Sequence, residues 1–146
     1  MPEKETLERA KEDKREGKAP STQAGEFVRE EIEHIREGKH GARSAKQAIA
    51  IGLSKARRAG VKLPAPKNAP KEVREQAARD SRKGKSAGKG KTSAKRSRAS
   101  SRALKREGHS AASRTALSRH ARSAASKRSA AARSRSAKKA AATRKK

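Results

Sequence analysis

The sequence predicts a mostly disordered chain with α-helices, in which a small antiparallel helical hairpin is followed by a long, basic, low-complexity tail. Only 30% of the residues are hydrophobic, most of them are alanine, and Phe27 is the single aromatic residue. From Ser81 to Lys146, 23 lysine and arginine residues stand against one acidic residue, Glu107. Large apolar side chains recur at helical spacing only within 20–63. A chain with so little to bury cannot offset the entropy cost of ordering over most of its length.

Residues 1–19 form the first zone, which is almost wholly charged. Glu5 and Arg9 are four residues apart, a spacing that supports a helix by a few tenths of a kcal/mol. Gly17 is expected to end that helix. We expect it to be solvated on every side and only partly formed, because it has no apolar stripe.

Residues 20–63 form the second zone and carry the predicted hairpin. The first helix begins near Pro20 and ends at Gly38, with Val28, Ile32 and Ile35 at i, i+4 and i+7. The short segment that follows makes the next helix its antiparallel neighbour. Five glutamates stand against two arginines at 26–37, whereas the second helix carries only cations, so opposite charges favour the pairing.

The second helix is expected to begin at Ser44, because Ser44 and Gln47 have capping-box spacing. Ile49, Leu53 and Ala56 share one face, and Gly60 fits a C-terminal cap. Ile51 falls outside that face. It indicates either self-association or docking on another element, or it is a lone exposed side chain on a marginal hairpin.

Residues 64–96 form a linker, and residues 97–146 form the tail. Three prolines within 62–70 predict a stiff, extended spacer. A weak helix follows from Pro70, with Val73 and Ala77 on one face. The tail repeats short blocks of serine, alanine and arginine, for example at 110–114 and 123–128. We expect it to be open in solution, because its cations repel one another, and to become helical over 101–142 when a duplex neutralises it.

Several functional classes are disfavoured. The absence of cysteine excludes disulfides, thiolate catalysis and Cys-based zinc sites. Neither a secretory signal nor a run of transmembrane length is present, so no membrane partner is expected and a cytoplasmic protein is indicated. The GKGKTS run at 88–93 lacks the glycine spacing of a phosphate-binding loop, since position 85 is lysine. Nothing around the tail serines predicts a pocket, so we expect no enzyme and no cofactor.

The four histidines do not have the spacing of a metal site. His34 and His40 flank the hairpin turn and could approach each other, but no other ligand is evident near them. His109 and His120 are isolated in the tail. The favoured interpretation is that these are solvated histidines and that the chain holds no metal.

The charge asymmetry of the tail makes it the candidate nucleic-acid-binding site. A solubilising surface would not need 23 cations against one anion, so a polyanionic partner is favoured. The residues expected to contact nucleic acid are Lys95, Arg96, Arg98, Arg102, Lys105, Arg106, Arg114, Arg119, Arg122, Lys127, Arg128, Arg133, Arg135, Lys138 and Lys139.

The mode of contact follows from what the tail lacks. It has no aromatic side chain on which to stack unpaired bases, which excludes single-strand stacking platforms and RNA-recognition sheets. Zinc fingers and leucine zippers are excluded as well. Phosphate neutralisation with little base reading remains, together with insertion of arginine into narrow minor grooves.

Two resemblances add to this interpretation. The segment KQAIAIGLSKARRAG, from Lys46 to Gly60, closely resembles the signature of a small, basic bacterial family of unknown function. The upstream GEFVREEIEHIREGKHGARS also resembles that family, so the likeness spans roughly 1–63 and implies a bacterial source without an activity. The tail is similar in composition to bacterial histone-H1-like proteins, although it is richer in arginine and serine than in lysine and proline.

The sequence therefore predicts a non-enzymatic, nucleoid-associated protein that binds DNA through phosphates, independently of base sequence. Duplex DNA is favoured over RNA as the partner. Two alternatives remain. In the first, the chain is an RNA- or ribosome-associated basic protein. In the second, the hairpin is a protein-interaction module to which the tail adds electrostatic attraction. Base preference, oligomeric state and any partner of the hairpin are left open.

Overall fold

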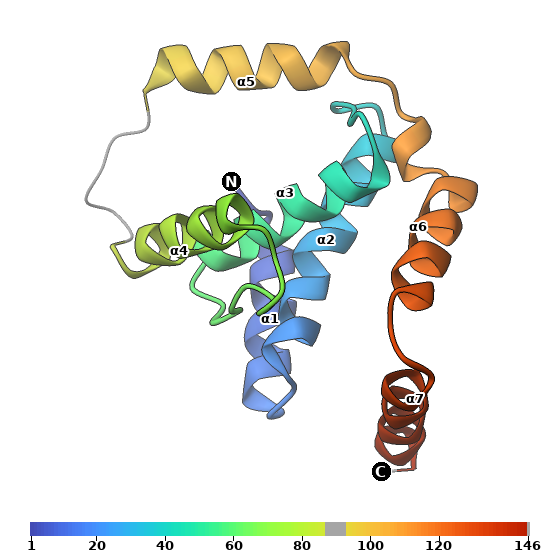
Figure 1. Cartoon of the computed structure of the whole chain (residues 1–146). Helices are drawn as coiled ribbons and strands as arrows, with labels where there is room; N and C mark the ends of the chain where they lie inside the picture. The colour runs from blue at the N-terminus through green and yellow to red at the C-terminus, as the bar shows by residue number, and fades with distance from the viewer. Residues whose placement is uncertain (87–92, 146) are drawn as a thin grey trace.

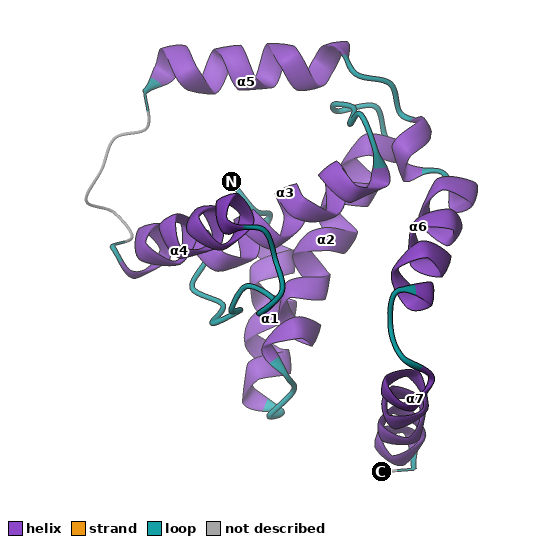
Figure 2. Cartoon of the chain, viewed as in Figure 1, coloured by secondary structure: helices purple, strands orange, loops and turns teal. Residues whose placement is uncertain are grey.

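The computed structural model describes residues 1–86 and 93–145, and in these ranges the chain is helical and has no strand (Figures 1 and 2). The prediction of a mostly disordered chain is wrong, because the tail is helical as well. The elements are α1 (Lys4–Arg15), α2 (Pro20–Arg36), α3 (Ala45–Arg58), α4 (Lys71–Lys85), α5 (Ala94–Arg106), the short 3₁₀ helix η1 (Ser110–Ala112), α6 (Arg114–Ser126) and α7 (Ala130–Arg144).

Helices α2 and α3 pack antiparallel and form the centre of the fold (Figure 1). Gly52 of α3 lies against Val28 of α2, and a Cβ at Gly52 would be 2.7 Å from the Val28 Cα. Ala48 and Ala56, one turn to either side, are fully buried. The face of α3 that meets α2 is therefore made of small residues, which lets the two backbones approach closely.

The face of α3 that packs on α2 differs from the one that the sequence predicts. Ile49 and Leu53, which were expected to form its centre, are only half-buried. Leu53 packs at the margin of a cluster built around Phe27, Ala24 and Ala56. Ile51 is half-buried too, so it is not the lone exposed side chain that one of the two alternatives described.

Helix α1 packs on α2, which contradicts the expectation of a solvated, partly formed helix. Thr6 and Ala10 are buried at 1% and 6% exposure, and Ala10 belongs to the cluster around Phe27. The Arg9 Nε atom lies 3.2 Å from a carboxylate oxygen of Glu26. A few small side chains and a cross-helix ion pair therefore replace the apolar stripe that α1 lacks.

Helix α4 is anchored on α3 by a buried carboxylate. Asp80 is fully buried, accepts a hydrogen bond from the Ser54 hydroxyl and lies 2.8 Å from the Arg58 Nε atom. Gln76 donates to the same carboxylate. Val73, expected on the packed face of a weak helix, is 49% exposed. A buried acid surrounded by donors therefore takes the place of an apolar seam.

We predict that Asp80→Asn lowers the free energy of unfolding by about 2–3 kcal/mol at pH 7, since it removes charge-assisted hydrogen bonds from a buried site. Urea denaturation followed by circular dichroism measures this loss. Glu72→Gln is the matched control, because Glu72 is exposed on the same helix. Equal stability of the two variants would show that Asp80 does not hold α4 in place.

The same carboxyl predicts acid sensitivity. Burial opposes its ionisation, but the hydrogen bonds from Ser54, Arg58 and Gln76 outweigh burial and hold the pKa of Asp80 below 3.8. The ordinary pKa of this carboxyl, 3.8, applies to the unfolded chain, and its folded-state pKa is lower. Ionised Asp80 therefore stabilises the fold above the unfolded-state pKa, and this stabilisation is lost as the pH falls through the folded-state pKa. Asp80→Asn should remove this part of the acid dependence.

The tail folds partly by capping its own helices. Serine is the N-cap of α5, α6 and α7, and the three side chains accept hydrogen bonds from the backbone amides of Arg96, Ala116 and Ala132. Each cap satisfies an amide that a helix N-terminus otherwise leaves free. Alanine, lysine and arginine then continue the helices, because they are strong helix formers. The tail is therefore helical without a duplex, contrary to the expectation that repulsion among its cations keeps it open.

The segment between α5 and α6 docks onto the hairpin turn. The amide of Gly41 donates to the carbonyl of Leu104 at 2.9 Å, and the amide of Ala42 donates to that of Gly108 at 3.1 Å. The next block, Ser110–Ala112, forms η1 and buries Ala111 and Ala112 against Ile32 and Ile35. This contact joins the tail to the N-terminal half of the chain.

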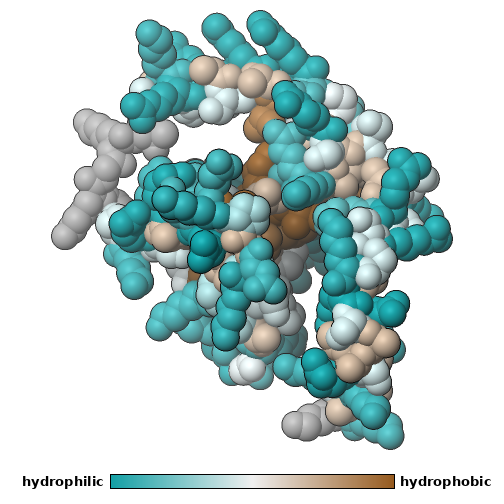
Figure 3. Space-filling view, in the orientation of Figure 1, coloured by the Kyte–Doolittle hydropathy of each residue, from teal (hydrophilic) through white to brown (hydrophobic). Residues whose placement is uncertain are grey.

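Beyond this contact the tail helices are exposed. Helices α5, α6 and α7 contain no buried residue, although Leu117 of α6 packs at the edge of the cluster under η1. Figure 3 shows hydrophilic side chains over most of the visible face, with the most hydrophobic surface in a seam between them. None of the helices in the described ranges is long and apolar enough to cross a membrane.

Candidate nucleic-acid interface

The candidate contact residues of the tail are all exposed, and they occupy three helices and one connection. Helix α5 carries Lys95, Arg96, Arg98, Arg102, Lys105 and Arg106, and α6 carries Arg114, Arg119 and Arg122. Helix α7 carries Arg133, Arg135, Lys138 and Lys139, and Lys127 and Arg128 lie between α6 and α7. The structure thus distributes them over successive helices and does not gather them into one pocket.

None of these fifteen side chains lies within 4.0 Å of a carboxylate in residues 1–86 and 93–145. Two of them bond locally instead, since Arg98 donates to the carbonyl of Ala94 and Arg128 donates to that of Ala132. The one acidic residue of the tail, Glu107, faces Arg43 at 3.5 Å. The positive charge of the tail is therefore uncompensated within the described chain.

The cations of α3 behave differently. Lys55 lies 2.6 Å from a carboxylate oxygen of Glu31, and Arg58 lies 2.8 Å from Asp80. Arg57 is buried at 8% exposure and donates to the carbonyl of Leu63 at 2.9 Å. The basic character of α3 therefore serves mainly to hold the fold together, and little of it is free for a partner.

Helix α5 carries a one-sided cationic stripe. Each member along the stripe is three or four residues from another member, so they lie on one face of the helix. This α5 stripe consists of Lys95, Arg98, Arg102, Lys105 and Arg106. It extends over about 16 Å at the helical rise, the axial length of about five base pairs of duplex. Arg96 lies outside the stripe, as does the half-buried Leu104.

Helices α6 and α7 present their cations in two other ways. In α6, Leu117 packs toward the core, and Arg119 and Arg122 lie on the opposite side of the helix and face solvent. In α7, Arg135, Lys138 and Lys139 share one side of the helix, Arg133 lies on the other side, and no residue is buried. The five-membered stripe on α5 is therefore the largest one-sided group of candidate cations on the tail helices.

Docking also places one cation of the hairpin beside the tail. A shallow groove is lined by Arg36, His109, Ala112, Ser113 and Arg114. Arg36 donates to the carbonyl of Ala112 at 3.0 Å and remains exposed. Sequence reasoning missed Arg36, because only the docking of η1 brings it near α6. The GKGKTS run rejected as a phosphate-binding loop lies, apart from Ser93, outside the described residues.

One family model matches part of the chain. Residues 21–68 match a family of unknown function, DUF6496. The match covers α2, α3 and the extended segment after α3, and it leaves the whole tail outside. No curated protein and no solved structure matches the chain.

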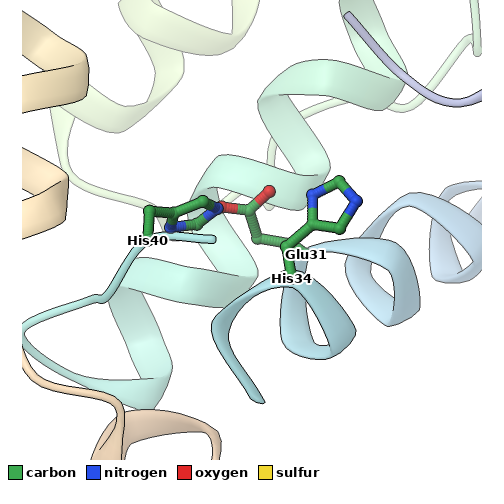
Figure 4. Close-up of side chains that lie close together, drawn as sticks. All are labelled: Glu31, His34 and His40. Atoms are coloured by element: carbon green, nitrogen blue, oxygen red, sulfur yellow. The ribbon is translucent and has the colours of Figure 1, made fainter. Parts of the chain in front are cut away.

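A second group of functional side chains lies at the hairpin turn. Glu31 and His34 of α2 and His40 of the turn each place one potential ligand atom within 4.8 Å of the other two (Figure 4). The sequence suggested that the two histidines could approach each other but favoured solvated side chains. Both rings are half-buried, and Glu31, which sequence reasoning did not consider, is fully buried. The signal that could have found it is the i, i+3 spacing of Glu31 and His34.

Proposed function

We propose that this chain is a non-enzymatic DNA-binding protein that contacts the phosphates of duplex DNA without regard to base sequence. The observation that carries the proposal is the contrast between two sets of cations. Three of the four cations of α3, Lys55, Arg57 and Arg58, are held by carboxylates or carbonyls of the fold, whereas the fifteen of the tail face solvent without a carboxylate partner in the described chain. Exposed, unpaired cations attract phosphates at long range and release the counterions bound to them.

The helical form of the tail favours duplex DNA over RNA as the partner. The major groove of B-form DNA is about 12 Å wide and admits a helix, whereas the major groove of A-form RNA is too narrow for side chains to read. Helix α5 presents its stripe on one side, so it can lie along the edge of a groove and contact a row of phosphates. Nucleoid association in a bacterial cytoplasm, as for histone-H1-like proteins of similar composition, is the physiological role we propose.

The packing of the hairpin argues against its use as a free interaction module. Helices α1 and α4 and the η1 segment already pack on α2 and α3. The large apolar side chains that remain exposed in the described chain are Met1 and Val73, which lie outside the hairpin. A protein partner would therefore find little apolar surface on α2 and α3.

Fluorescence anisotropy with two duplexes of unrelated sequence and equal length tests this function. The chain should bind both with affinities that agree within about threefold, because phosphate contacts carry no sequence information. Structured RNA added as a competitor should displace the DNA only at a large excess. A preference of more than about 100-fold for one duplex would contradict sequence independence, and displacement by equimolar RNA would favour an RNA-associated role.

A further inference from the structure

We propose that Glu31, His34 and His40 form a binding site for a transition-metal cation such as Zn²⁺. Glu31 and His34 are three residues apart on α2 and so share a face of that helix. The chain turns back at Gly38, where φ is +75°, and this brings His40 to the same place (Figure 4). The three ligand atoms lie within 4.8 Å of one another.

The hydrogen bond made by His40 determines which nitrogen faces the cluster as a ligand. Its Nδ1 atom lies 3.1 Å from the carbonyl oxygen of Gly41. A carbonyl only accepts, so Nδ1 carries the proton, and in the neutral ring Nε2 holds a lone pair. That Nε2 atom lies 3.1 Å from the Oε1 atom of Glu31. Two lone pairs directed at each other need a cation or a proton between them.

His34 is oriented in a similar way. Its Nε2 atom lies 2.9 Å from a carboxylate oxygen of Glu3, which accepts a hydrogen bond from that nitrogen. Figure 4 shows the other ring nitrogen on the side that faces Glu31. Histidines that bind metals commonly donate their second ring nitrogen to a carboxylate or a carbonyl, which orients the ring. Both histidines of this cluster have such an acceptor.

Glu31 supplies an independent indication of a ligand. Its side chain is 1% exposed, and its Oε1 atom is buried without a hydrogen-bond partner in the described chain. The other oxygen, Oε2, accepts a hydrogen bond from Lys55 at 2.6 Å. Buried carboxylate oxygens are normally satisfied, so an unpartnered one aimed at two imidazoles calls for a cation.

The donor set indicates the class of metal. Two imidazole nitrogens and one carboxylate oxygen are a known set of three protein ligands for zinc, and water takes the fourth position of the tetrahedron. Mg²⁺ and Ca²⁺ prefer oxygen ligands only, whereas imidazole suits zinc, copper and nickel. Ligand atoms of tetrahedral zinc lie about 3.3–3.6 Å apart. The separation of His40 Nε2 and Glu31 Oε1, 3.1 Å, is close to this.

Metal titration of the metal-free chain, prepared without a histidine tag, tests the proposal. Isothermal titration with ZnCl₂ should show one site per chain, and CoCl₂ should give the visible absorption of tetrahedral Co²⁺. His40→Ala and His34→Ala should each weaken binding by at least about tenfold, since each removes a ligand. His120→Ala is the control, because His120 lies on α6 outside the cluster.

Two results would overturn the site. The first is the absence of Zn²⁺ binding by the unmodified chain, which would leave a protonated His40 as the partner of Glu31. The second is equal binding by His40→Ala and His120→Ala, which would place the metal elsewhere. Circular dichroism of each variant shows whether its helices persist, so a loss of binding is not mistaken for a loss of fold. These outcomes are independent of DNA binding.

Discussion

Replacing the five cations of the α5 stripe by glutamine should weaken duplex binding on the order of 10²-fold or more at about 0.1 M salt. The substitutions are Lys95→Gln, Arg98→Gln, Arg102→Gln, Lys105→Gln and Arg106→Gln. All five residues are exposed and bury nothing, so the fold should be unaffected. Each phosphate contact that is lost should lower the slope of log affinity against log salt by about 0.9. Anisotropy titrations at several salt concentrations measure both quantities.

A matched variant distinguishes the effect of the position of the cations from the effect of the net charge. Replacing Lys4, Lys11, Lys14, Lys62 and Lys67 by glutamine removes the same five charges from exposed sites outside the tail. This control should lose much less affinity, because the removed charges do not lie along the proposed contact. If the two variants lose affinity equally, overall charge governs binding and α5 has no special part in it.

The second large effect is expected at Gly41. A Cβ at this position would be 2.0 Å from the carbonyl oxygen of Glu107 and 2.5 Å from that of Gly108. Backbone atoms cannot move aside as the end of a flexible side chain can. Gly41→Ala should therefore separate the tail from the hairpin turn. The loss of two backbone hydrogen bonds and of the burial of Ala111 and Ala112 should lower the free energy of unfolding by about 2–4 kcal/mol.

Chemical denaturation gives the free-energy change, and amide hydrogen exchange at Gly41 and Ala42 reports the docking itself. Gly25→Ala is the control, since a Cβ there meets nothing within 4 Å. Gly25 lies inside α2, where alanine should stabilise the helix by about 0.5–1 kcal/mol. The free energy of unfolding should therefore fall in Gly41→Ala and rise in Gly25→Ala. Unchanged amide exchange at positions 41 and 42 in Gly41→Ala would contradict the docking.

The two helices of the hairpin could be derived from local signals. The Ser44 side chain accepts from the Gln47 amide at 3.2 Å, as its capping-box spacing suggested. Gly38 and Gly60 adopt positive φ where the helices end. Such signals involve residues a few positions apart, so they can be read without knowledge of tertiary contacts.

The order of the tail could not be derived in the same way. Ala111 and Ala112 belong to a block that recurs at 123–128, yet only this copy is buried. The difference arises because Gly41 admits the backbone of 107–108 and so positions η1 over Ile35. Contacts between residues about 65 positions apart leave no local trace in a low-complexity sequence.

The candidate interface also has features that the sequence predicts and features that depend on tertiary contacts. The exposure of the tail cations follows from composition, because one acidic residue cannot pair with 23 cations. The α5 stripe is visible in the spacing of its residues once a helix is assumed. The approach of Arg36 to Arg114, and of Glu31 to the two histidines, depends on how the turn and the tail fold back. Sequence spacing alone could not show either of them.

The salt dependence of duplex binding by the full chain tests the central claim most directly. If exposed tail cations neutralise phosphates, log affinity should fall linearly with log salt, with a slope of about −0.9 for each phosphate contacted. Six or more contacts would reduce the affinity by about 10³-fold or more between 50 and 200 mM salt. An affinity that stays within about threefold over that range would contradict the account, because binding would then not depend on the charge of the tail.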